Sequence, residues 1–191
     1  HAGLLSNRIE NELRELNMES VIFKVDFTQH ADDQGVRLSD GKKVAYDSHG
    51  LEQVEFLIAP NPGEGLKPLV KIASGGETSR LMLALKNVLA AADPLPTLIF
   101  DEIDQGIGGR VGGIVGHKLW NLSHKHQVIC VTHLPQLAAF GNQHFHVYKL
   151  IQEGRTLTRI KHLQGEDRLT ELALMFGEIS EGTLQSAKDL L

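Results

Sequence analysis

Two short apolar runs in the second half of the chain constrain its fold most strongly. The run 97–100 leads directly into Asp101 and Glu102, and the run 127–131 leads into Thr132 and His133. A strand that is apolar on both sides has to be covered on both faces, which is the usual situation of a parallel strand between helices. We therefore expect these two runs to be parallel core strands of an α/β layer with right-handed crossovers.

The flanking patterns predict the other elements of a mixed α/β fold. An apolar stripe over residues 4–17 has helical spacing, whereas residues 21–27 and 53–59 alternate as half-buried strands do. Glu153-Gly154 lies between two further strand patterns and indicates a hairpin. The remaining predicted elements are a short strand at 44–46, helices at 78–92 and 110–124, hairpin strands at 145–151 and 156–163, and one or two helices within 167–191.

Composition excludes several classes of protein. The chain has 191 residues, of which 41% are hydrophobic, and its net charge of −5 does not indicate a surface dominated by nucleic-acid contacts. The single cysteine, Cys130, excludes an internal disulfide framework and a cysteine-based zinc cluster. No apolar stretch approaches the length of about 18 residues that a membrane span requires. The sequence therefore favours a soluble, cytoplasmic protein with no membrane partner.

The strand ends carry the candidate chemistry. In open α/β sheets, ligands bind beyond the carboxyl ends of the strands, where Asp101, Glu102 and His133 are expected. Asp101 is suited to a hydrated Mg²⁺, and Glu102 is suited to orienting or deprotonating an attacking water. The alternative is that the two carboxylates simply end a strand and cap the next loop.

A second candidate site is the Ser74-Gly75-Gly76 segment at the start of a predicted helix. Bare amides at a helix N-terminus attract anions, and paired glycines allow a phosphate to approach the backbone. The alternative is an ordinary serine cap followed by a tight turn. The chain contains no Gly-x-x-x-x-Gly-Lys-Ser/Thr phosphate-binding loop of its own.

In order along the chain, these segments resemble the motifs of ABC-type ATPases. Residues 73–77 resemble the signature motif, and 98–102 resemble a Walker B strand with its catalytic glutamate. Residues 103–107 resemble the D-loop, and 131–133 resemble the switch-histidine segment. The residue sequence of the motifs between 72 and 141 is similar to that of the RecN family. The members of this family are SMC-like ATPases of bacterial DNA double-strand-break repair.

This resemblance implies a role for each candidate residue. Asp101 would hold Mg²⁺, Glu102 would be the catalytic base, and His133 would contact the γ-phosphate of ATP. Asp104 would act where two heads meet. The signature residues would contact ATP bound mainly by the second head of an ATP-dependent homodimer; they are Ser74, Gly75, Gly76 and Glu77.

The resemblance also implies an arrangement of the whole protein. The P-loop would come from an N-terminal part of the same protein, so we expect this chain to be inactive alone. Residues 1–18 would be the end of a coiled-coil arm, and 19–191 the C-terminal portion of the head. DNA, as ends or single-stranded regions, is the implied partner, and the bacterial nucleoid is the implied location.

Two other functions remain open at the level of sequence. One is a chromosome-organising ATPase of the SMC type, and the other is a stand-alone metal-dependent hydrolase using Asp101, Glu102 and His133. DNA contact has little support from charge, since the candidates for a basic patch are better interpreted as solvated surface. Those candidates are Lys67, Lys71, Arg80 and Arg110.

Overall fold

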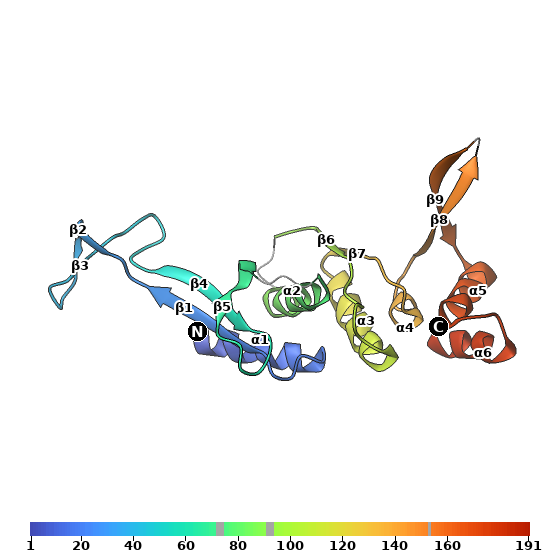
Figure 1. Cartoon of the computed structure of the whole chain (residues 1–191), viewed down its shortest axis with the longest axis horizontal. Coiled ribbons are helices and arrows are strands. Elements are labelled where there is room, and N and C mark those ends of the chain that lie inside the picture. The colour runs from blue at the N-terminus through green and yellow to red at the C-terminus, as the bar shows by residue number, and fades with distance from the viewer. Residues whose placement is uncertain (72–74, 91–93, 153) are drawn as a thin grey trace. The chain divides into compact units, whose positions relative to one another are not determined.

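The computed structural model describes residues 1–71, 75–90, 94–152 and 154–191, and Figure 1 labels its elements in chain order. The chain divides into two compact units, residues 1–74 and 75–191. This division falls inside the predicted head portion 19–191, and the boundary predicted at residues 18 and 19 stays a prediction.

The first unit is a small sheet with a helix packed against it. Strand β1 pairs antiparallel with β4, and β4 pairs antiparallel with β5. Helix α1 packs on β1 through its apolar stripe, because Ile9, Leu13 and Leu16 are fully buried. The elements of this unit are α1 (Ala2–Glu15), β1 (Ile22–Thr28), β2 (Ala31–Arg37), β3 (Lys43–Val44), β4 (Gln53–Ala59), β5 (Lys67–Pro68) and the 3₁₀ turn η1 (Leu69–Lys71).

Local chemistry fixes the end of α1 and its contact with the sheet. Asn17 has a φ of 61°, the left-handed conformation that commonly ends a helix. Glu10 on α1 accepts a hydrogen bond from the backbone N–H of Phe23 on β1 at 3.0 Å. The helix and the first strand are therefore joined by both apolar packing and a polar contact.

The second unit contains the predicted parallel strands. β6 and β7 pair in parallel from Thr97 with Gln127 to Phe100 with Cys130, which confirms the predicted α/β layer. The bounds are α2 (Gly75–Leu89), β6 (Thr97–Phe100), α3 (Gly109–Ser123), β7 (Gln127–Cys130), α4 (Pro135–Ala138), β8 (His144–Gln152), β9 (Arg155–Leu163), α5 (Gly165–Phe176) and α6 (Glu181–Leu190). The predicted end of α2, near residue 92, lies outside the described residues, and the helix itself ends at Leu89.

The expectation that both faces of these strands are covered is not met within the described residues. Leu98 and Phe100 are buried, but Ile99 is 69% exposed and Ile129 is 45% exposed. Because alternate side chains of a strand point to opposite faces, one face of the β6–β7 pair is left open by the second unit itself.

The C-terminal part of the second unit consists of a hairpin and two helices. β8 and β9 pair antiparallel along their whole lengths, and the hairpin rises away from α5 and α6 (Figure 1). Leu172, Ala173 and Ala187 form the buried centre of the α5–α6 pair. None of the helices in the described ranges is long and apolar enough to cross a membrane.

Candidate functional site

The loop after β6 presents two carboxylates to solvent. Asp101 and Glu102 are both exposed, and Asp101 Oδ1 accepts a hydrogen bond from the Glu102 backbone N–H at 2.9 Å. Glu102 has a φ of 56°, a conformation that costs a residue with a side chain about 1 kcal/mol or more. A strained turn at this position therefore holds the second carboxylate in the open at the carboxyl end of β6.

A third carboxylate in the same loop is buried and joins it to the segment after β7. Asp104 is 4% exposed, and its Oδ2 accepts hydrogen bonds from Thr132 Oγ1 and from the His133 backbone N–H at 2.8 Å. The same oxygen lies 3.0 Å from Nδ1 of the His133 imidazole. With its proton on Nδ1, the ring donates to Asp104 and leaves Nε2 for an outside partner. Asp104 thereby fixes both the backbone and the ring of His133.

The first turn of α2 packs directly against the loop after β6. The Gly76 backbone N–H donates to Gln105 Oε1 at 3.2 Å, and Ser79 Oγ donates to the Asp101 carbonyl at 2.7 Å. A Cβ added to Gly75 would collide with Glu102 Oε2. With a side chain at Gly75, the exposed end of the Glu102 side chain would have to shift away from the helix.

A buried arginine strengthens the same contact. Arg80 is 8% exposed, and its Nη1 donates to the carbonyl of Gln105 at 2.7 Å. Burial lowers the pKa of Arg80, and the charge of Glu77 on the same helix acts in the opposite direction. The interpretation of Arg80 as solvated surface is therefore wrong, because its guanidinium lies inward and holds the loop.

The structure brings together most of the residues that the sequence singled out. Gly75 meets Glu102, and Asp104 meets His133, all within the second unit. Glu77 is half-buried in the first turn of α2, where its negative charge is favourable. Ser74 lies outside the described residues.

Sequence reasoning missed the partners that connect these residues. Gln105, Arg80 and Thr132 carry no chemistry in isolation, and they act here through contacts 25 to 29 residues apart in the chain. Gln105 and Thr132 do lie inside the quoted motifs, which is the one signal that pointed to them.

The carboxylate of Asp101 fits a hydrated magnesium ion. Mg²⁺ keeps several waters and binds one or two carboxylates together with phosphate oxygens, instead of a cage of protein ligands. Asp101 is an exposed carboxylate of this kind, and the described residues contain no group of three or more metal-ligating side chains.

Comparisons with known proteins place the chain in a family. It is 38% identical over 194 residues to the DNA repair protein RecN of Bacillus subtilis, covering 100% of this chain and 34% of that protein. It is 44% identical over 192 residues to RecN of Treponema pallidum, covering 100% of this chain and 32% of that protein. The chain thus spans about a third of the length of these curated relatives. No family model matches it.

A solved structure supports the fold. The Smc head domain of Pyrococcus furiosus, with an extended coiled coil and bound to the C-terminal domain of ScpA, has a TM-score of 0.50 and 17% identity. The match covers 88% of this chain and 36% of that one. The fold is that of the C-terminal part of an Smc-type head domain. Within that class, the chain belongs to the RecN family of DNA repair proteins, and it corresponds to their C-terminal part.

Proposed function

We propose that the chain is the catalytic C-terminal part of a RecN-type head that hydrolyses ATP between two heads during DNA repair. The observation that carries this proposal is the cluster at the carboxyl ends of β6 and β7. There the exposed Glu102 lies against the first turn of α2, and the buried Asp104 holds His133. The RecN relatives give this cluster its biological context.

Each residue of the cluster has a distinct proposed role. Asp101 would hold Mg²⁺, which when bound neutralises charge on the phosphates. Glu102 accepts the proton of the attacking water, and its exposure leaves the carboxylate accessible to that water. Asp104 keeps His133 in one tautomer and orientation, so that Nε2 contacts the γ-phosphate. A direct contact of Asp104 with a second head stays a prediction, since its carboxylate is turned inward in this chain.

The signature segment is proposed to act on nucleotide held by the other head. Ser74, Gly75, Gly76 and Glu77 make up this segment. The Gly76 N–H is already bonded to Gln105, so phosphate binding there would require Gln105 to release it. Gln105 therefore links occupancy of the signature segment to the position of the loop that carries Glu102.

We further propose that the rest of the protein completes the head. A P-loop is absent from the 191 residues, and the open face of the β6–β7 pair carries Ile99 and Ile129. An N-terminal P-loop part would cover this face and bind most of the nucleotide. The homodimer, DNA as partner and location at the bacterial nucleoid belong to the same proposal.

The test is Mg²⁺-dependent ATP hydrolysis by three samples: this chain, a separately made N-terminal P-loop part, and their mixture. We expect hydrolysis only in the mixture and in the full-length protein. Hydrolysis by this chain alone, at the rate of the full-length protein, would overturn the composite head and favour a stand-alone hydrolase.

Replacing the proposed base tests the site itself. In the full-length protein, Glu102→Gln should slow turnover by about 10²- to 10⁴-fold, because general-base catalysis typically contributes that much. ATP binding, measured with a fluorescent analogue, should persist. Glu178→Gln, at another exposed glutamate, is the matched control and should leave turnover unchanged. Near-normal turnover in Glu102→Gln would refute the assigned role.

A further inference from the structure

The β8–β9 hairpin has two chemically different faces. Directly opposite residues of an antiparallel pair share a face, and the pairs Tyr148–Arg159, His146–Lys161 and Gln152–Arg155 all lie on one of them. This basic face is defined by Tyr148, Arg155, Arg159 and Lys161. We call the opposite face the apolar face for its exposed Phe145, Val147, Ile151 and Ile160; it also carries Lys149, Thr156, Thr158 and His162.

Positive charge is concentrated on this hairpin although the chain as a whole is acidic. Residues 144–163 contain four lysines or arginines and one acidic residue, in a protein with a net charge of −5. Three of the four basic residues lie on the basic face. Such a local excess against the overall charge is the electrostatic footprint expected of a polyanion-binding surface.

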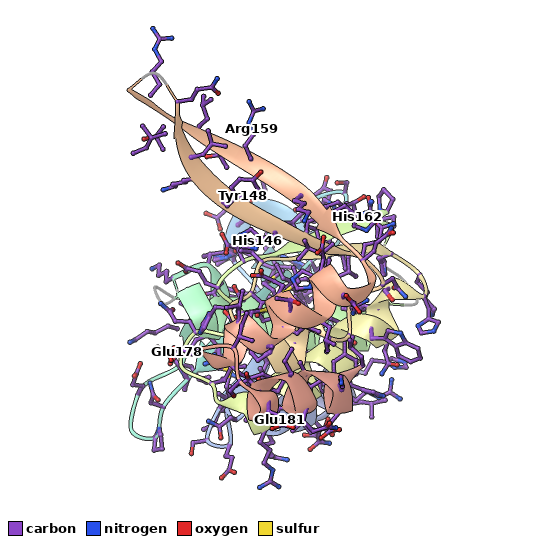
Figure 2. The ribbon with its side chains drawn as sticks, turned by 90° about the vertical axis from the view of Figure 1, so that its right-hand side faces the viewer. His146, Tyr148, Arg159, His162, Glu178 and Glu181 are labelled. Carbon is purple, nitrogen blue, oxygen red and sulfur yellow. The ribbon has the colours of Figure 1, made fainter. Side chains whose placement is uncertain are left out.

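Among the described residues, no ion pair neutralises the outer half of the basic face. At the foot of the hairpin, Lys161 Nζ pairs with Asp167 and His146 Nδ1 pairs with Glu171, both at 2.7 Å. Arg155 and Arg159 are exposed and form no ion pair with any residue in the described part of the chain. Figure 2 shows Tyr148 and Arg159 on the part of the hairpin that extends beyond the helices.

The contact between Lys161 and Asp167 is weak enough to be exchanged. Both side chains are more than half exposed, and exposed ion pairs contribute little, typically 0–1 kcal/mol. A phosphate approaching Lys161 would therefore replace Asp167 at small cost. This adds a third cation to the two arginines along the same face.

The apolar face indicates which way the hairpin is oriented in the complete head. Ile151 is 78% exposed, Ile160 is 68% exposed and Val147 is 62% exposed, so this face requires a protein cover. Covering it leaves the outer half of the basic face, with Arg155 and Arg159, directed at solvent. The two faces therefore suit different partners, protein on one side and a polyanion on the other.

We propose that the basic face of the β8–β9 hairpin binds the phosphate backbone of DNA. At about 3.3 Å per residue, the row from Arg155 to Lys161 spans about 20 Å, the axial length of roughly six nucleotides of one DNA strand. Guanidinium groups match phosphate oxygens bidentately, and Tyr148 offers a ring on which a base can stack. The inference rests on the proposed function in naming DNA, and adds to it a contact surface.

The experiment uses full-length protein carrying Arg155→Ala and Arg159→Ala together. Affinity for a labelled single strand and a labelled duplex, each of about 30 nucleotides in length, is measured by fluorescence anisotropy from roughly 50 to 200 mM salt. The control removes two exposed basic residues elsewhere, Arg37→Ala with Lys125→Ala. Thermal unfolding and ATP hydrolysis without DNA verify that each variant is folded.

The double variant should bind DNA about 10- to 100-fold more weakly at low salt, and the slope of log affinity against log salt should be shallower by about 2. The control should bind like the wild type. If the double variant loses more affinity for one form of DNA, single strand or duplex, that form is the one that contacts the basic face.

Four results would overturn the proposal, one of them from a parallel anisotropy measurement with labelled polyglutamate. If the double variant binds DNA as tightly as the wild type, the basic face is not a DNA contact, although the protein still binds DNA elsewhere. An equal loss in the control would assign the effect to total charge. A loss of binding to polyglutamate without a loss of DNA binding would assign the face to an acidic protein. If the wild type binds neither the single strand nor the duplex, the proposed function fails together with this inference.

Discussion

The two sheets at the centres of the two units differ in how completely the chain covers them. In the first unit, Phe23 of β1 is 2% exposed and Ile58 of β4 is fully buried. In the second unit, β6 and β7 bury Leu98 and Phe100 on one side and expose Ile99 on the other.

The sequence pattern of each strand accounts for the difference. β1 and the first half of β4 alternate apolar and polar residues, so one covered face is enough to bury Phe23 and Ile58, while Ile22, Phe27 and Val54 stay exposed. β6 and β7 are apolar at nearly every position, so they need a cover on each face, and the described residues supply only one. A continuous apolar run thus predicts a cover on both faces of a strand, and the second unit by itself supplies one; the proposed N-terminal P-loop part would supply the other.

The largest expected effect falls on the self-contained sheet. Phe23→Ala in this chain should lower the free energy of unfolding by about 3–5 kcal/mol, because a buried ring is replaced by a cavity. The substitution also removes the ring contact between Phe23 and Phe56, whose centroids are 5.5 Å apart. Urea unfolding followed by circular dichroism measures the change. A loss below about 1 kcal/mol would show that the first unit is not built around this residue.

A smaller effect is expected at the buried carboxylate of the second unit. Asp104→Asn in the full-length protein should slow ATP turnover by about 10- to 100-fold, since groups that orient a functional histidine typically contribute that much. If Asp104 acts through His133, its replacement in a His133→Ala background should have little further effect. A full additional loss in that background would assign Asp104 a structural role.

A substitution on the open face of the second unit should have different effects on stability in this chain alone and in the full-length protein. In this chain alone, Ile99→Ser should change the free energy of unfolding by less than about 0.5 kcal/mol, since the side chain is exposed. In the full-length protein the same change should cost about 1–3 kcal/mol, because Ile99 would then be buried. Equal effects in the two proteins would remove the basis for a covering layer.

The smallest expected effect concerns pH. Burial, together with the charge of Arg168, lowers the pKa of His144, whose Nδ1 is buried without a hydrogen-bond partner among the described residues. The folded chain therefore binds this proton less readily than the unfolded chain, so stability from neutral His144 is lost as pH falls below about 6.5. Between about pH 7 and pH 5, the wild type should lose more stability than His144→Gln in denaturant unfolding. Parallel curves would contradict the shift.

Sequence patterns predicted the elements with a clear apolar pattern well and those with few apolar residues poorly. The bounds of β4 and β6 match the predicted runs, because alternation and continuous apolarity mark them clearly. Strand β2 was missed, since Ala31–Arg37 is almost entirely polar and becomes a strand only by pairing with β3. Helix α2 begins at Gly75, three residues before its predicted start, because glycines rarely mark a helix interior.

The candidate site shows the same limit. Strand ends identified Asp101, Glu102 and His133, since topology places such residues at one edge of a sheet. The inward contact of Asp104, the buried position of Arg80 and the link through Gln105 depend on how distant segments pack. The chemical roles of all these residues stay predictions.

The close approach of Gly75 to Glu102 affects how genetic data on this family should be interpreted. On the proposed roles, a substitution at Gly75 would be made to test the signature segment. In this chain, a side chain there would also push aside the exposed end of the Glu102 side chain. A phenotype at Gly75 would therefore report on both positions.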